Sequence, residues 1–105
     1  MKNIRIYISG KVHKTGFLFF AKQMARQFNI NGLVKYDTNL SVFIEAEGKY
    51  EALDLFVKYC QVGPVGSKIK SIHIEEGIVQ NYKSFKIIDK SIPKEQSGSL
   101  EKQFD

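Results

Sequence analysis

Residues 10–18 combine residue types and a spacing that could do anion chemistry. They read GKVHKTGFL, with two glycines, a histidine and two lysines between an alternating apolar segment and an amphipathic one. A loop that runs from a strand end into a helix start directs backbone N–H groups and the positive end of the helix dipole toward one point. We therefore expect an anion site here, although a strand, a turn and a helix with two glycines is also ordinary packing.

Two periodic segments position this loop. Before it, Ile4, Ile6 and Ile8 alternate with other residues, which is the period of a half-buried strand. After it, apolar residues recur at i, i+3, i+4, i+7, i+8 and i+11, which predicts a helix with one apolar face. They are Phe17, Phe20, Ala21, Met24, Ala25 and Phe28. We expect Thr15 to be the N-cap of this helix.

The remaining elements follow in alternation. Strands are expected over residues 33–37, 41–46, 68–76 and 85–88, and a second helix over residues 50–62. The short hairpin between the second and third strands contains Asn39, a residue type that tolerates positive φ. The order βαββαβ, with one extra short strand, predicts the α+β class. We expect a ferredoxin-like split βαββαβ sandwich, with an antiparallel sheet and two helices on one face.

Length and composition indicate a single small domain. The chain has 105 residues, of which 43% are hydrophobic, enough for one core. We expect residues 1–90 to form this domain and residues 91–105 to be a polar tail, in which Leu100 and Phe104 could dock as a short helix. No apolar run has the length of a membrane span or a signal peptide, so we expect a cytoplasmic protein. We also expect a monomer.

Charge and cysteine content narrow the function classes. The formal net charge is +5, and residues 1–90 carry 14 Lys and Arg against 8 Asp and Glu. This balance favours an anionic partner, but it can equally serve solubility. The lone Cys60 lies on the apolar face of the second helix, where we expect a buried thiol rather than a catalytic one. We expect no metal and no cofactor.

Five short matches make the chain resemble the acylphosphatase family over residues 4–88. The family signature G-x-V-Q-G-V-G-F-R corresponds to GKVHKTGFL at residues 10–18, and G-x-V-x-N-x-x-D-G corresponds to GLVKYDTNL at residues 32–40. Shorter matches are AEG at residues 46–48, GP at residues 63–64 and FKI at residues 85–87. The resemblance implies the ferredoxin-like fold reached above.

The resemblance also implies a reaction, which is hydrolysis of the carboxyl-phosphate bond of acyl phosphates without a metal. In the family, loop N–H groups hold the phosphate, an arginine binds its oxygens, and an asparagine orients the attacking water. At these two catalytic positions the chain carries Leu18 and Tyr36. We therefore expect a weakly active or inactive member, a pseudoenzyme, that keeps a phosphate-binding loop. The loop residues are His13, Lys14, Thr15, Gly16, Phe17 and Leu18.

Some residues could compensate for the two replacements. Lys14 adds a cation inside the loop, although it stands where the family has a glycine, and Lys22 lies one helical turn beyond Leu18. His13, where the family has glutamine, could act as an acid or a base. An active acylphosphatase with a rebuilt site therefore remains an alternative.

Two binding functions are further alternatives. Tyr7 and Phe43 alternate away from the core on their strands, with Arg5 and Lys35 beside them, as on the open sheet of RNA-recognition domains. The sequence lacks the aromatic motif of those domains, and nucleic acid is not the partner we expect. Phe19 points away from the apolar face of its helix, so with Leu18 beside it, which we also expect to be exposed, it could contact another protein.

Overall fold

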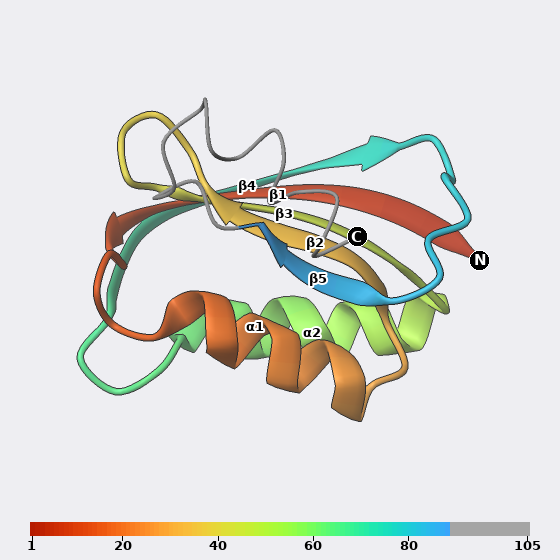
Figure 1. The fold of residues 1–105 in the computed structure, drawn as a ribbon, viewed down its shortest axis with the longest axis horizontal. Coiled ribbons are helices and arrows are strands. Elements are labelled where there is room, and N and C mark those ends of the chain that lie inside the picture. The colour runs from red at the N-terminus through yellow and green to blue at the C-terminus, as the bar shows by residue number, and fades with distance from the viewer. Residues whose placement is uncertain (89–105) are drawn as a thin grey trace, which may run out of the picture.

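The computed structural model describes residues 1–88, which form one sheet with both helices on the same face (Figure 1). The strands are β1 (Lys2–Lys11), β2 (Asn31–Tyr36), β3 (Val42–Gly48), β4 (Lys68–Gly77) and β5 (Phe85–Ile88). The helices are α1 (Phe17–Gln27) and α2 (Tyr50–Val62). The predicted ferredoxin-like class is confirmed, whereas the expected tail with Leu100 and Phe104 lies outside the described residues.

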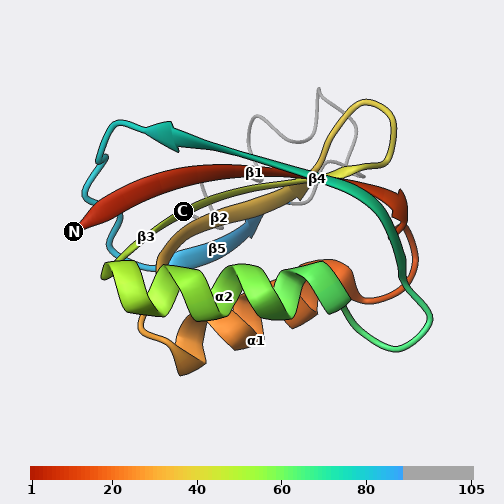
Figure 2. The ribbon, with the colours of Figure 1, turned by 180° about the vertical axis from the view of Figure 1, so that it is seen from behind.

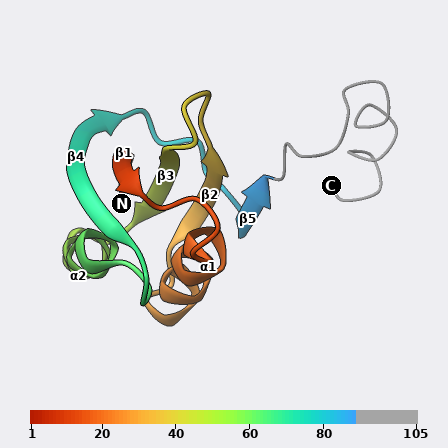
Figure 3. The ribbon, with the colours of Figure 1, turned by 90° about the vertical axis from the view of Figure 1, so that its left-hand side faces the viewer.

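The sheet is mixed rather than wholly antiparallel. Its strand order is β4-β1-β3-β2-β5, and the first three neighbouring pairs are antiparallel as predicted. Strand β5 instead pairs parallel to β2, with Gly32 opposite Phe85. The reason is that the chain reverses after β4, so β5 runs against β4 and therefore in the direction of β2. This arrangement brings residues 83–88 beside α1 (Figure 3).

The core lies between the sheet and the two helices. Viewed along the strands, α1 packs beneath β2 and β5 while α2 packs beneath β3 and β4 (Figure 3). The view from behind shows α2 in front of α1 against the same face (Figure 2). The fully buried side chains come from both layers and include Ile6, Ile8, Val34, Ile44, Phe17, Ala21 and Phe56. The two predicted apolar faces are thus the buried ones.

A buried polar cluster attaches the segment between β4 and β5 to the open face of the sheet. Asn3 Nδ2 donates to Glu45 Oε2 at 2.9 Å and to Glu47 Oε2 at 2.8 Å. The backbone N–H groups of Gln80 and Tyr82 donate to Glu47 as well, and Tyr82 OH donates to Glu45 Oε1 at 2.8 Å. These bonds fix the segment that delivers β5 to the edge of the sheet.

The electrostatics of this cluster follow from its burial and its donors. Burial by itself raises the pKa of Glu47, but the donors around it, Gln80 N–H, the Asn3 amide and Tyr82 N–H, outweigh burial and hold the pKa below its ordinary value of 4.5. Burial, together with the adjacent Glu45 carboxylate, raises the pKa of Tyr82 to about 12. Glu47 is therefore an anion and Tyr82 a neutral donor at neutral pH.

Candidate functional site

The chain bends toward the loop near the end of β1, at a backbone position that requires glycine. Gly10 has φ +133°, and a Cβ there would lie 2.1 Å from the Lys68 carbonyl oxygen. The pairing of β1 with β4 shifts register between Ser9 and Gly10, which marks a β-bulge. The bulge and the Val12 N–H to Gly10 carbonyl bond of 3.1 Å turn the chain toward the start of α1.

Two residues of the loop take the left-handed conformation. Gly16 has φ +80° and Lys14 has φ +62°. A Cβ added to Gly16 would meet no atom within 4 Å, so the space beside its Cα is open to a ligand. Lys14 adopts this conformation at a cost that a glycine would avoid, of order 1–2 kcal/mol. Lys14 thus holds the loop in a turn that glycine adopts more readily.

The prediction that Thr15 caps α1 is wrong. The N-cap is Gly16, which makes no side-chain cap bond. The Thr15 hydroxyl donates instead to the Val12 carbonyl oxygen at 2.6 Å, closing the loop on itself. As a consequence, no side chain occupies the N–H groups at the start of this helix.

The start of α1 has the properties of an anion site. Phe17 is fully buried and anchors the first turn, and the first bond of the helix runs from Phe20 N–H to the Gly16 carbonyl at 2.9 Å. The preceding N–H groups, those of Phe17 and Leu18 among them, have no acceptor within the helix. The first turn contains no acidic residue. Together with the helix dipole, this leaves the helix start open to negative charge.

Leu18 and Phe19 differ in their surroundings. Leu18 is half-buried and packs against the core, so only part of it faces solvent. Phe19 is 76% exposed, as expected from its position on the helix. Among the described residues, Phe19 therefore supplies most of the surface suggested for a protein partner, and Leu18 supplies less.

Tyr36 lies beside the loop and contacts His13. It is the last residue of β2, and like Val34 it projects to the face covered by the helices. Its ring centroid is 5.1 Å from that of His13, with the two rings 76° apart in an edge-on arrangement. The structure thus brings together two residues that are 23 positions apart and that the sequence assigned to the same site.

The other predicted residues lie at separate places. Lys14 is exposed in the loop, whereas Lys22 lines a hollow between α1 and β5. The hairpin after β2 places Leu40 at positive φ, with φ +60°, next to Asn39. The Leu40 N–H donates back to the Asp37 carbonyl at 3.0 Å, which closes the turn.

Within residues 1–88, neither the cysteine nor a cluster of metal-ligating side chains forms a further candidate site. Cys60 is buried in the core, and burial raises the pKa of its thiol to about 12. Within residues 1–88, no group of three or more His, Cys, Asp or Glu side chains is placed to hold a metal ion. No helix in the same range is long and apolar enough to span a bilayer.

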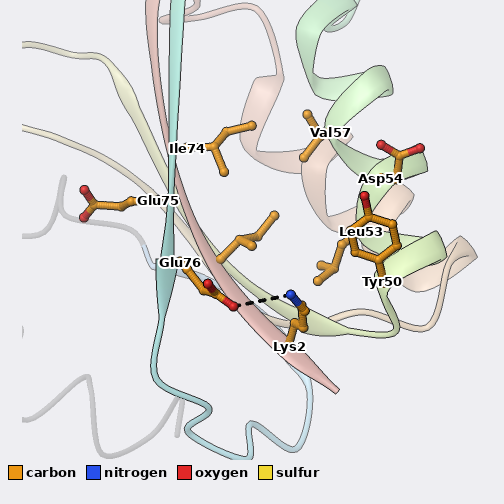
Figure 4. Close-up of a pocket in the computed structure, with 9 residues that line it drawn as sticks. Lys2, Tyr50, Leu53, Asp54, Val57, Ile74, Glu75 and Glu76 are labelled. Atoms are coloured by element: carbon orange, nitrogen blue, oxygen red, sulfur yellow. Dashed lines mark hydrogen bonds and ion pairs between the residues drawn. The ribbon is translucent and has the colours of Figure 1, made fainter.

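A hollow of about 370 Å³ lies between β4 and α2 (Figure 4). No residue of the 13–18 loop lines it. Its floor is apolar, and the 3.5 Å ion pair of Lys2 with Glu76 crosses its lower side (Figure 4). Ile74 is 40% exposed on its wall, because β4 is the edge strand of the sheet and α2 covers it only in part. Glu75 points away to the other face of the sheet (Figure 4).

The open face of the sheet carries a row of rings, as the RNA alternative required. Tyr7 lies 5.2 Å from Phe43 and 5.9 Å from His73, measured between ring centroids. Lys35 Nζ is 5.4 Å from the centre of the Phe43 ring. The Tyr7 hydroxyl, however, donates to Glu75 Oε1 at 3.1 Å, which places a carboxylate in this row.

Comparison with known proteins identifies the family. The Acylphosphatase family model matches residues 4–87. An acylphosphatase of Pseudothermotoga lettingae is 36% identical over 88 residues, covering 84% of this chain and 99% of the relative. One of Archaeoglobus fulgidus is 32% identical over 84 residues, covering 80% and 94%. The crystal structure of Bacillus subtilis acylphosphatase superposes with a TM-score of 0.82 at 31% identity, covering 84% and 99%.

Proposed function

This chain belongs to the acylphosphatase family, and from that membership we propose that residues 13–18 bind the phosphate of an acyl phosphate but hydrolyse it slowly or not at all. Support for binding comes from the loop itself, with Gly16 open to solvent and the helix start free of acidic residues. The phosphate-binding residues in this proposal are His13, Lys14, Thr15, Gly16, Phe17 and Leu18.

The observation that carries the proposal is the pair of side chains beside the loop. The family reaction needs a planar cation on the phosphate oxygens and an amide that orients water. Leu18, at the first position, has no donor and turns part of its side chain to the core. Tyr36, at the second, places a ring against His13 where a short amide would leave room for water.

The size of the expected defect follows from these roles. Removal of one preorganised donor costs about 10²- to 10³-fold in rate, and an arginine on a transferring phosphoryl group contributes about 10³- to 10⁵-fold. Groups that act as a unit are not additive, so the two losses need not multiply. Even the smaller one leaves a poor enzyme.

The test is hydrolysis of benzoyl phosphate by the purified chain. We expect kcat/KM to be at least about 10²-fold below that of the Bacillus subtilis acylphosphatase measured in parallel. A value within about tenfold of that enzyme would contradict the proposal and favour the rebuilt site. In that case Lys14→Gln should abolish most of the activity, because Lys14 is the cation that the loop itself contains.

The proposal also has a domain part. Residues 1–90 are proposed to be the acylphosphatase-like domain and residues 91–105 a tail that the site does not need. The family match ends at residue 87, which supports this division. A chain that ends at Lys90 should keep the unfolding midpoint of the full chain and the same benzoyl phosphate rate. A fall in either would contradict the division.

A further inference from the structure

A second hollow, of about 500 Å³, lies between α1 and β5 and is lined by cations without any carboxylate among the described residues. Lys22, Arg26 and Asn29 line it from the side of α1, and Lys83 lines it from the segment before β5. Asn31 and Lys86 border it at the sheet edge, but the register places their side chains with Leu33 on the opposite face of the sheet. No residue of the 13–18 loop lines it. It is therefore distinct from the phosphate loop described above.

The fold gathers these cations from two distant parts of the chain. Lys22 and Arg26 are four residues apart on α1 and so share one side of the helix. The parallel addition of β5 brings Lys83, two residues before that strand, next to them, because α1 packs against both β2 and β5. Backbone and side-chain bonds hold this second part in place. They run from Gly32 N–H to the Ser84 carbonyl at 2.9 Å and from Asn31 Nδ2 to the Tyr82 carbonyl at 3.0 Å.

The charges of Lys22, Arg26 and Lys83 are not neutralised by an ion pair within residues 1–88. The ion pairs of that range join Lys2 to Glu76, Lys58 to Asp54 and His73 to Glu75, none of which is in the hollow. The C-terminal end of α1 contributes about half a negative charge, which is less than the three cations. Like charges at i and i+4 repel each other, and a bound anion would relieve this repulsion.

We propose that this hollow binds a chain of two or three linked phosphates, carried by a nucleotide or by inorganic polyphosphate. Linked phosphates carry enough charge and length to engage the helix pair, Lys22 and Arg26, together with Lys83. The Arg26 guanidinium can bind two oxygens of one phosphate, and Lys22 and Lys83 supply point charges around the others. The amide of Asn29 can donate to the same ligand.

Titration with inorganic tripolyphosphate and, separately, with metal-free ATP tests the proposal on the full chain. Amide NMR shifts should appear at residues 22–31 and 83–86, with an affinity that falls steeply as salt rises. The variant with Arg26→Gln and Lys83→Gln should bind about tenfold more weakly. The control with Lys49→Gln and Lys70→Gln removes the same charge from exposed positions elsewhere and should stay within about twofold.

The results of the titrations and of the two double variants each support or overturn the proposed site. Equal affinity for the two probes upholds the site as a receptor for the phosphate chain alone, and tighter binding of ATP upholds it as a nucleotide site. Equal losses in the two double variants would overturn the proposal in favour of general charge attraction. Shifts confined to residues 13–18 would overturn it too, while supporting the phosphate loop. The benzoyl phosphate rate does not depend on this hollow, so the two proposals fail separately.

Discussion

The ring of His13 packs edge-on against the ring of Tyr36, with centroids 5.1 Å apart, across the gap between the loop and the end of β2. Each stands at a position where the family resemblance predicts an amide side chain, glutamine at the first and asparagine at the second. An aromatic pair of this geometry contributes about 0.5–1.5 kcal/mol beyond its buried area. The pair therefore stabilises the loop while it occupies the space that a water-orienting amide would leave open.

Inorganic phosphate should bind weakly at the start of α1. The open space beside Gly16 and the free N–H groups of the first turn favour a small anion there. A phosphate titration should shift the amide NMR signals of residues 14–18, and sodium chloride at equal ionic strength should not. An absence of specific shifts in this loop would mean that it no longer binds phosphate.

The left-handed backbone at Lys14 should be measurable as a stability difference. Lys14→Gly and Lys14→Ala remove the same charge, but only glycine adopts φ +62° without strain. The glycine variant should be about 1 kcal/mol more stable than the alanine variant in urea unfolding followed by far-UV circular dichroism. Equal stabilities, or a more stable alanine variant, would show that the loop backbone is not strained at this residue.

How far the sequence predicts the fold depends on how local the signal is. Helix α2 begins at Tyr50 and ends at Val62, as its apolar periodicity and the following Gly63 predict. Strand β2 begins two residues earlier than expected, at Asn31. It includes Gly32, whose Cα approaches the Glu45 carbonyl too closely for any side chain. The parallel pairing of β5 depends on the reversal after β4, which no local pattern encodes.

The candidate site, like the fold, is predictable from the sequence only where the signal is local. Loop residues 10–18 are recognisable because their types and spacing are local, and the left-handed Lys14 follows from its place at a family glycine. The cap at Gly16 was missed because the Thr15 hydroxyl had a nearer acceptor, the Val12 carbonyl. The basic hollow was missed as well, since the spacing of Lys22 and Arg26 on α1 was its only local signal.

Low pH should reduce the free energy of unfolding through protonation of Glu47. Its pKa is lower in the folded state than in the unfolded state, so its stabilisation is present above pH 4.5 and is lost as pH falls toward the folded value. Glu47→Gln should lower the free energy of unfolding at pH 7 by about 1–3 kcal/mol, because buried donors lose a charged acceptor. The difference from the parent should shrink below pH 4.5 in urea unfolding.

A matched control separates this effect from general charge. Glu51 is exposed in the first turn of α2, where its carboxylate contributes a few tenths of a kcal/mol at most. Glu51→Gln should therefore change the unfolding free energy little at either pH. Parallel pH profiles for the parent and Glu47→Gln would refute the role of Glu47.

RNA should bind only through nonspecific charge. The Glu75 carboxylate accepts from Tyr7 and lies 3.5 Å from His73 Nε2, so negative charge sits among the rings that would stack on bases. Filter binding with a random-sequence RNA pool should show weak association that falls steeply as salt rises. Tight binding at physiological salt that disappears in Tyr7→Ala or Phe43→Ala would make the open face a nucleic-acid surface.

The reason proposed for slow hydrolysis can be tested by restoring the two side chains. Leu18→Arg supplies a planar cation at the first turn of α1, and Tyr36→Asn supplies an amide at the end of β2. Both native residues are half-buried at the edge of the core, so the double variant should lose only about 1–2 kcal/mol of stability. It should hydrolyse benzoyl phosphate at least about 10²-fold faster than the parent.

The single variants and a third substitution complete the test. Leu18→Arg and Tyr36→Asn should each give less than their share of the gain, because the two groups act on one transition state. A folded double variant as slow as the parent points to the loop, and Lys14→Gly is then the change to add, since it relaxes the left-handed position. If the triple variant is also inactive while circular dichroism shows the native fold, Leu18 and Tyr36 are not the cause of the slow reaction. The residue-level transfer from the family would then be wrong.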